Sequence, residues 1–375
     1  MNAMTLREER VRGDVDVLSR AGLPLDEFIA EAIASVSRAI TWDGVCVGTH
    51  DPDTGILTSS RKYGALASRN EADQRFGHIE YGDQEVTTFQ RLLAAGVRSV
   101  GIDLYTGGEV ERSVRMEQLI VPEYGFTDEA RLLFVDGGRF WGAMALFRGP
   151  GERRFGEAEV DFLATLGPLF ARGLRTGVLA RLGESAPVRA LGPAVVIVDE
   201  HDRLSQVTPA AHAWLEGLVR GSHRGDPFSV VAPLVSTARR YARGETDAVA
   251  SARVRTADGA WLVLRAAPLS NAEGLVRDVV ISIEEARPPE ILSLIVASYG
   301  LTVREGDVIR LVLQGADTRQ IAATLHLSAY TVQDHLKAIF DKTDVRSRRE
   351  LIALIFADQY APRLGSELGP SGSFA

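Results

Sequence analysis

The sequence feature that most constrains the fold is a series of closely spaced helix-start signals near the end of the chain. Three residue pairs have the spacing of a capping box: Thr302 with Glu305, Asp317 with Gln320, and Ser347 with Glu350. In a capping box each side chain accepts a hydrogen bond from the other residue's backbone N–H. Ser328 provides a further N-cap, and Gly315 suits the left-handed end of the first helix. Together these signals predict an all-α segment of four short helices within residues 301–356.

The third of these helices has two chemically different faces. At about 100° per residue, Val332, Leu336 and Ile339 fall on one side, while Gln333, Asp334 and Lys337 fall on the other. A short helix, a tight turn at 326–327 and then such a helix are the layout of a helix-turn-helix, whose second helix enters the major groove of DNA. A helical bundle with a solvated face fits the same periodicity.

Residues 301–348 favour the DNA-binding reading, because they resemble the LuxR-type DNA-binding domain without a gap. The resemblance rests on the motifs Leu301-Thr-Val-Arg-Glu, Gln320-Ile-Ala-Ala-Thr-Leu, Thr331-Val332, His335-Leu336-Lys337 and Val345-Arg-Ser-Arg. Two departures from the family pattern are Gly306, unusual inside a helix, and Asp344, where glycine is frequent. We assign residues 295–360 to this domain and 361–375 to a flexible tail.

The side chains of the third helix suggest how it would read DNA. Gln333 can pair with adenine, Asp334 can accept from cytosine, and Lys337 can donate to guanine. The resemblance points to the same positions. A second group suits contacts with phosphates: Ser328, Thr331, His335, Arg346 and Arg348.

The fourth helix carries more apolar surface than a small core needs. Family resemblance makes this helix a dimer contact, formed by Leu351, Ile352 and Ile355. Two copies would place recognition helices about 34 Å apart on double-stranded DNA with an inverted repeat. The predicted assembly is therefore a homodimer.

Residues 1–183 read as an α+β domain. Strand-like runs at 44–49, 56–60, 131–135 and 140–147 lie between helical patterns at 25–40 and 156–175. The segment resembles a GAF domain through Asp51-Pro-Asp-Thr-Gly, Gly138-Arg-Phe-Trp-Gly and Arg154-Phe-Gly-Glu-Ala. Aromatic and thiol side chains could line a small-molecule pocket there, although such residues also suit an ordinary core: Trp42, Cys46, Tyr81, Phe89, Trp141 and Phe147.

Residues 190–286 read as a second α+β domain, which resembles a PAS domain in the order of its elements. Val195 to Asp199 and Leu204 to Val207 form a strand pair, and Thr208-Pro209 begins a helix. Three strand-like runs follow at 250–256, 260–267 and 276–283. Linkers are expected around 181–189 and 284–290, which contain Gly and Pro.

Composition excludes several other functions. The 375 residues carry a net charge of −8, of which −7 lies within residues 1–185 and none within 301–375, so a DNA contact belongs at the back of the chain. One cysteine excludes multi-cysteine zinc sites and disulfide frameworks, and no Walker A loop, nucleophile elbow or zinc-protease motif occurs. No apolar run is long enough to cross a membrane, which predicts a cytoplasmic protein. We expect no catalytic residue, no metal site and no required cofactor.

The sequence therefore predicts a DNA-binding transcriptional regulator that acts as a dimer and responds to a signal in its GAF-like and PAS-like domains. Two alternatives stay open. One is a small-molecule receptor like those of quorum sensing, and the other is a ligand-free regulator controlled by a partner protein.

Overall fold

The computed structural model describes residues 5–179, 192–219, 228–256, 260–270 and 276–360. The chain divides into two compact units, Met1–Glu284 and Glu285–Ala375. The expected linker at 181–189 and the expected tail at 361–375 both lie wholly outside the described residues. The two segments that the sequence analysis treated as separate sheet domains pack together within the first unit.

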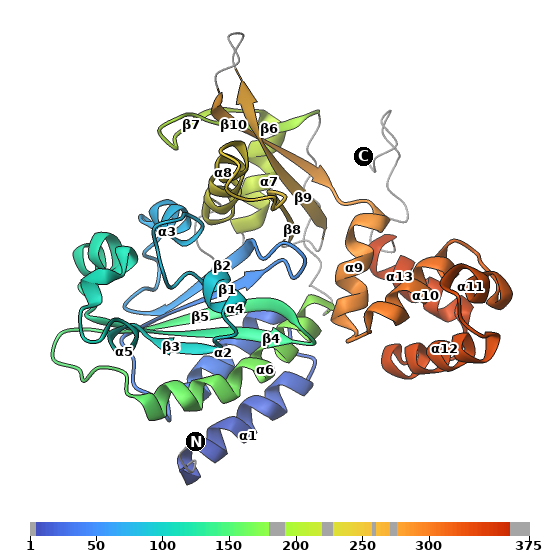
Figure 1. Cartoon of the computed structure of the whole chain (residues 1–375), viewed down its shortest axis with the longest axis horizontal. Helices are drawn as coiled ribbons and strands as arrows, with labels where there is room; N and C mark the ends of the chain where they lie inside the picture. Colours follow the sequence, from blue (N-terminus) through green and yellow to red (C-terminus); the bar gives the residue numbers. More distant parts are fainter. Residues whose placement is uncertain (1–4, 180–191, 220–227, 257–259, 271–275, 361–375) are drawn as a thin grey trace. The chain divides into compact units, whose positions relative to one another are not determined.

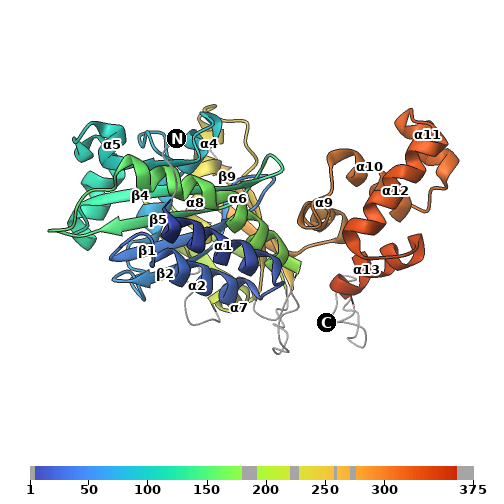
Figure 2. The same cartoon turned by 90° about the horizontal axis from the view of Figure 1, so that it is seen from below.

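The first segment is an antiparallel sheet with helices, as expected. Its elements are α1 (Leu6–Arg20), α2 (Leu25–Val36), β1 (Gly44–His50), β2 (Leu57–Gly64), α3 (Asp73–Glu80), α4 (Phe89–Ala94), β3 (Ser99–Gly101), α5 (Ile102–Thr106), η1 (Val110–Arg112), η2 (Met116–Tyr124), β4 (Asp128–Asp136), β5 (Arg139–Arg148) and α6 (Glu157–Leu179). The sheet order is β2-β1-β5-β4-β3. Helices α1, α2 and α6 contact one another and cover one face of the sheet (Figures 1 and 2).

The second segment is also a five-stranded sheet with helices, which confirms the expected α+β class. Its elements are β6 (Ala194–Val198), β7 (Leu204–Val207), α7 (Pro209–Val219), α8 (Phe228–Ala242), β8 (Ser251–Arg255), β9 (Trp261–Ser270) and β10 (Val276–Glu285). The strand order, β7-β6-β10-β9-β8, repeats the pattern of the first sheet. Thr208 accepts from the N–H of Ala211, so the predicted N-cap before Pro209 is present.

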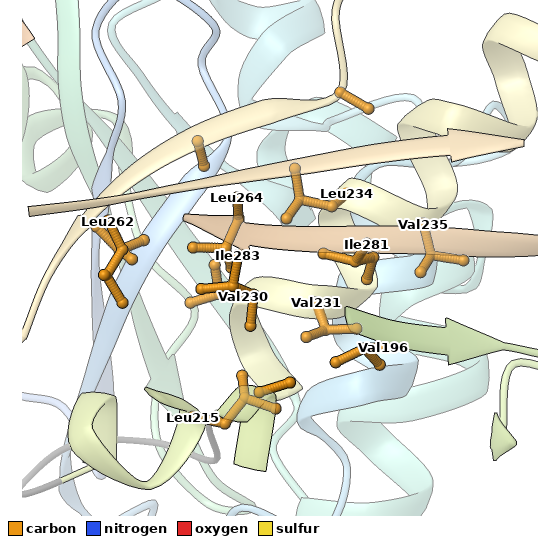
Figure 3. Packing of buried hydrophobic residues seen from close by; sticks show 14 of the residues in the cluster. Val196, Leu215, Val230, Val231, Leu234, Val235, Leu262, Leu264, Ile281 and Ile283 are labelled. Atoms are coloured by element: carbon orange, nitrogen blue, oxygen red, sulfur yellow. The ribbon is translucent and has the colours of Figure 1, made fainter. Parts of the chain in front are cut away.

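Apolar side chains of α7, α8 and this sheet form one buried cluster (Figure 3). Val230, Val231 and Leu234 of α8 face Leu264 and Ile281 of the strands. The cluster also contains Ile56, Leu57 and Tyr81 from the first segment. The two sheet-bearing segments therefore share part of their core.

The second unit is all-α, as expected, but contains five helices among its described residues instead of four. They are α9 (Pro288–Ser298), α10 (Val303–Leu313), α11 (Thr318–Leu325), α12 (Ala329–Thr343) and α13 (Arg348–Tyr360). The two units divide within the linker expected at 284–290, but this connection is shorter than expected, because β10 runs to Glu285 and α9 begins at Pro288. Proline is well tolerated in the first turn of a helix, so the paired prolines start α9 here.

Candidate nucleic-acid interface and ligand cavity

Helices α11 and α12 form the predicted helix-turn-helix. The side chain of Asp317 accepts from the N–H groups of Arg319 and Gln320 and so begins α11. His326 ends α11 in the left-handed conformation, with φ of 54°, which turns the chain sharply toward α12. Ser328 then caps α12 by accepting from the N–H of Thr331 at 3.0 Å. Local capping chemistry therefore fixes both the turn and the start of the second helix.

Helix α12 divides into the two faces that the periodicity predicts. Val332, Leu336 and Ile339 are buried in the core of the unit. Gln333, Asp334 and Lys337 are exposed, and none of them forms a hydrogen bond or ion pair within the part of the chain that the structure describes. Three side chains with different hydrogen-bonding chemistry thus stand free along one face of the helix.

The predicted phosphate-contacting residues differ in their surroundings. Ser328 and Thr331 share a hydroxyl–hydroxyl hydrogen bond of 2.8 Å at the start of α12, and His335 is half-buried. Arg346 is exposed, and its guanidinium has no partner among the described residues. Sequence reasoning placed Tyr330 on this face without giving it a role, yet its side chain is 76% exposed in the first turn of α12.

Arg348 does not fit its predicted role, because its guanidinium is already used inside the unit. It donates to the carbonyl of Ala316 at 3.0 Å and to the hydroxyl of Thr318 at 2.9 Å. Arg348 thereby ties α13 to the connection between α10 and α11. Lys342, which lies near the end of α12, is likewise engaged: it donates to both carboxylate oxygens of Glu305, at 2.7 and 2.9 Å.

The predicted dimer residues are also used within the unit. Leu351 is fully buried and Ile355 is 8% exposed, both in the same core as α9 and α10, while Ile352 is half-buried against it. The extra apolar surface of α13 has a partner in a helix that was not predicted, namely Ile295 and Val296 of α9. Leu351 and Ile355 therefore have little surface left for a dimer contact, and Ile352 is the predicted dimer residue that stays partly exposed.

Helix α9 also explains the glycine that departs from the family pattern. A Cβ on Gly306 would lie 3.0 Å from a methyl group of Val296. Glycine in a helix interior costs about 1 kcal/mol relative to alanine. Close packing of α9 against α10 gives a physical reason for that cost.

The first sheet holds a cavity of about 60 Å³ on the face away from α6. Its lining includes Cys46, Tyr81, Phe89 and Phe147, all proposed from the sequence, but neither Trp42 nor Trp141. The register of β4 and β5 shifts between Phe134 and Val135, so that Phe140 packs with the side chains on the cavity side. This bulge breaks the alternation of side chains along β5, so Trp141 does not follow Ala143, Ala145 and Phe147 to the cavity side. The polar side chains of this lining could not be recognised from the sequence: His50, Ser60, Lys62, Asp73, Glu80 and Ser229.

Neither a redox switch nor a metal site is built at this cavity. Desolvation by the surrounding side chains raises the pKa of the Cys46 thiol to about 11, so the reactive thiolate is scarce near neutral pH. Among the described residues, no three His, Cys, Asp or Glu side chains lie together as metal ligands. Over the same residues, no helix is long and apolar enough to cross a membrane.

Comparison with known proteins identifies the second unit. Residues 300–355 match the family of bacterial regulatory proteins called the luxR family. A monoamine regulon transcriptional regulator of Klebsiella aerogenes is 35% identical over 92 residues, which cover 21% of this chain and 40% of that protein. The chain thus spans less than half the length of this relative.

Two solved structures resemble parts of the chain more distantly. One is the GAF domain of an Acinetobacter phosphoenolpyruvate-protein phosphotransferase, with 12% identity and a TM-score of 0.30 over 46% of this chain and 94% of that one. The other is VqmA of Vibrio cholerae with ligand and DNA, with 20% identity and a TM-score of 0.22 over 44% and 83%. At these scores neither likeness bears on what this chain binds.

The capped helix pair, the exposed polar face of α12 and the family match all lie within the same stretch of chain. Residues 300–355 are therefore a helix-turn-helix domain of the type found in the luxR family of bacterial regulatory proteins.

Proposed function

We propose that the protein is a sequence-specific transcriptional regulator whose α12 reads bases in the major groove of DNA and whose first unit responds to a small molecule. The proposal that the protein binds DNA rests on the exposed face of α12. Gln333, Asp334 and Lys337 are exposed there and make no contact with the described residues. Because these side chains bind no other group of the described chain, they are available to contact DNA bases.

Each of the three side chains suits a different base edge. The amide of Gln333 can pair with adenine, the carboxylate of Asp334 can accept from the amino group of cytosine, and the ammonium of Lys337 can donate to guanine. A well-formed contact of this kind contributes about 1–3 kcal/mol of discrimination. Asp334 also opposes non-specific binding to phosphates, so the face favours selectivity over affinity.

Contacts with the DNA backbone would come from around the start of α12 and from the loop before α13. The first backbone N–H groups of a helix have no partner within the helix and suit a phosphate. At the start of α12 that of Thr331 is taken by Ser328, and the hydroxyl of Thr331 lies beside the others. His335 on the flank and exposed Arg346 complete this set. Arg348 is left out because its guanidinium is engaged with Ala316 and Thr318.

A homodimer on an inverted repeat is part of the proposal. The candidate face of α12 carries one cation, Lys337, and one anion, Asp334, so a single copy would bind weakly. Two copies joined on one DNA duplex would combine their contacts through effective concentration. The dimer contact is not assigned to Leu351 and Ile355, which are buried in their own unit.

A small-molecule signal is favoured over control by a partner protein because the first sheet encloses a cavity lined by polar as well as apolar side chains. We assign the sensing role to this GAF-like segment. The PAS-like segment shares the cluster containing Leu57 and Tyr81 with it, and we assign it the role of passing the response on.

Selection of binding sites from a random DNA library, followed by titration with the full chain, tests this function. We expect selected sites to contain two half-sites in inverted order about one helical turn apart. Lys337→Ala should relax preference at one base position per half-site. Arg346→Ala should weaken binding to all sequences alike and reduce the salt slope by about one unit.

Arg348→Ala is the matched control for Arg346→Ala, because the two arginines are two residues apart. Its guanidinium bonds within the unit, so this variant should lower stability and leave the salt slope unchanged. Selection of no common sequence, or equal effects of Lys337→Ala and Arg346→Ala on every sequence, would contradict the proposed reading of DNA.

A further inference from the structure

Two polar side chains of the cavity have no hydrogen-bond partner within the described residues. Nδ1 of His50 and Oγ of Ser60 are both buried without a partner, and their residues are only 5% and 6% exposed. They come from the paired strands β1 and β2, where Ser60 lies opposite Gly48, two residues before His50. A buried polar group left unpaired costs about 1–3 kcal/mol. A bound molecule that forms hydrogen bonds with His50 and Ser60 would remove this cost.

The backbone beside these two side chains also leaves room for a bound molecule, because it carries a glycine, Gly48. A Cβ on Gly48 would lie 2.7 Å from a methyl group of Leu57 and 3.2 Å from the ring of His50. Gly48 is itself part of the cavity lining. Glycine at this position therefore leaves room for the imidazole and for whatever contacts it.

The charged groups of the lining are already neutralised by one another. Lys62 donates to Asp73, to the carbonyl of Arg69 and to the side chain of Asn70. One oxygen of Glu80 accepts from the N–H of Phe89 at 2.6 Å, and the other accepts from Arg131 at 2.8 Å. No full charge of the described lining is left to pair with an ion.

His50 stays uncharged under all physiological conditions. Burial lowers its pKa to about 3, against the opposing effect of a hydrogen bond between the ring and the Gly48 backbone, and the nearby charge of Arg131 lowers it further. A neutral imidazole offers one donor and one acceptor, and a serine hydroxyl offers both. The ring packs 4.5 Å from Phe140 between centroids, so its orientation is set by its neighbours.

We propose that this cavity binds a small, uncharged molecule that has an apolar body and a hydroxyl or carbonyl group held by His50 and Ser60. The inference rests on the proposed function and names the class of its signal. The volume, about 60 Å³, is several times the roughly 10–15 Å³ that one buried water needs and less than half of the roughly 150 Å³ of a cavity that binds benzene, which limits the buried part of the ligand to a small group.

The position of the cavity explains how occupancy reaches the second sheet. Tyr81 lines the cavity, belongs to the shared apolar cluster, and accepts from the N–H of Leu57 at 2.8 Å. Ser229, at the start of α8, also lines the cavity. A molecule that presses on Tyr81 or Ser229 therefore acts on the core of the PAS-like segment.

Thermal unfolding of the full chain, followed by tryptophan fluorescence, tests the ligand class. Two neutral probes are each compared with a carboxylate of similar size: 2-propanol with acetate, and phenol with benzoate. We expect at least one neutral probe to raise the midpoint by about 2–4 °C and its carboxylate to have no such effect. Ser60→Ala and His50→Phe should each abolish the shift. Equal shifts from both members of each pair, larger shifts from the carboxylates, or no shift from either neutral probe would overturn the proposal.

The free protein gives a second, independent readout. Ser60→Ala removes an unpaired hydroxyl, so the midpoint should stay the same or rise. Ser113→Ala is the matched control, because the buried Ser113 donates to Glu85 at 2.8 Å, and its midpoint should fall by about 2–4 °C. A comparable fall for Ser60→Ala would mean that ordered water holds the site, which contradicts a ligand. DNA selectivity without ligand is measured separately, so failure of this inference leaves the DNA-binding function untouched.

Discussion

The two units of the chain are stabilised by different kinds of interaction. In the unit Glu285–Ala375, side chains close in sequence begin and end the helices, as Thr302 with Glu305 and Asp317 with Gln320 do. In the unit Met1–Glu284, several of the largest fully buried side chains are arginines: Arg61, Arg115, Arg131 and Arg148. Their partners are distant in sequence, as for Arg131 and Glu80.

This difference teaches that the second unit depends on local signals, whereas the first unit depends on charges brought together by folding. Arg115 donates to Glu129 at 2.8 Å and lies 3.6 Å from Glu85, with all three side chains fully buried. Removing one member of such a network leaves a buried charge unpaired, which costs far more than losing a surface pair. Substitutions in the first unit should therefore have larger effects than substitutions of caps in the second.

The two units can be followed separately in the intact protein. All four tryptophans of the chain, at positions 42, 141, 214 and 261, lie in the first unit. Tryptophan fluorescence therefore reports unfolding of the first unit alone. Hydrogen exchange of peptides from residues 300–355 reports the DNA-binding unit.

The largest effect is expected for Arg131→Met. Its guanidinium donates to the carbonyl of Thr87 at 2.6 Å and to Glu80 at 2.8 Å, and lies 3.6 Å from the centroid of the Phe89 ring. Loss of the charge should lower the free energy of unfolding by about 3–5 kcal/mol in urea titrations followed by tryptophan fluorescence. Arg172→Met, which breaks a half-exposed pair with Asp16, should cost about 1 kcal/mol or less. If the two variants lost the same free energy of unfolding, the expected difference between buried and surface charges would be contradicted.

Acid should destabilise the first unit through Glu85. Burial alone would raise the pKa of this carboxyl, but the charge of Arg115 and hydrogen bonds from Thr87 and from the Arg115 backbone lower it from 4.5 to about 2. Because the folded pKa is the lower one, the stabilisation is complete above pH 4.5 and disappears as the pH falls toward 2. The loss is about 3 kcal/mol. The same urea titrations across this range should show a shallower pH dependence for Glu85→Gln, and an unchanged slope would contradict this role.

The contact between the two sheets should have an intermediate effect. Asp51, in the turn after β1, accepts from the N–H and Nε of Arg253 on β8 at 2.9 and 2.8 Å. Asp51→Asn should cost about 2 kcal/mol, because Arg253 also bonds to Asp53 and keeps one partner. Asp199 occupies the equivalent turn of the second sheet, but its carboxylate accepts only from nearby backbone groups. Asp199→Asn should therefore cost less than 1 kcal/mol, measured in the same way.

The smallest effect is a gain in the DNA-binding unit. Asp344 ends α12 with φ of 54°, a conformation that costs a non-glycine residue about 1 kcal/mol. Asp344→Gly should slow hydrogen exchange in residues 300–355 by an amount that corresponds to about 1 kcal/mol. Asp341→Gly is the control three residues earlier, inside the helix, and should speed exchange by a similar amount. Faster exchange for both variants would show that Asp344 makes a contact that outweighs its strain.

Sequence patterns predicted the local features of the second unit better than they predicted contacts between distant residues. The boxes at Thr302 and Asp317 were predicted and are present, because capping depends on residues three positions apart. At Ser347 the prediction was half right: Ser347 accepts from Glu350, but the Glu350 side chain bonds to the N–H of Arg346. Helix α9 was missed, because its prolines read equally well as a linker and as a first turn. With α9 missed, Leu351 and Ile355 were assigned to a partner outside the chain.

In the first unit, the sequence indicated most of the strands and little of the site. Strand-like runs of residues predicted β1, β2, β4 and β5, but the bulge that moves Trp141 away from the cavity depends on pairing between strands. Nothing local marks His50 and Ser60 as unpaired, since that depends on which side chains surround them. The Asp51 turn was read correctly as a turn, while its bond to Arg253, about 200 residues away, could not be inferred.

By itself, the sequence determined the class of each segment, the helix-turn-helix and the residues on the free face of α12. These features follow from periodicity and capping, which act over a few residues. The tertiary structure decided which arginines serve the fold instead of DNA, which helix covers α13, and which polar groups line the cavity without a partner. The physical reason is that burial and charge pairing depend on neighbours in space, and in this chain those neighbours are far apart in sequence.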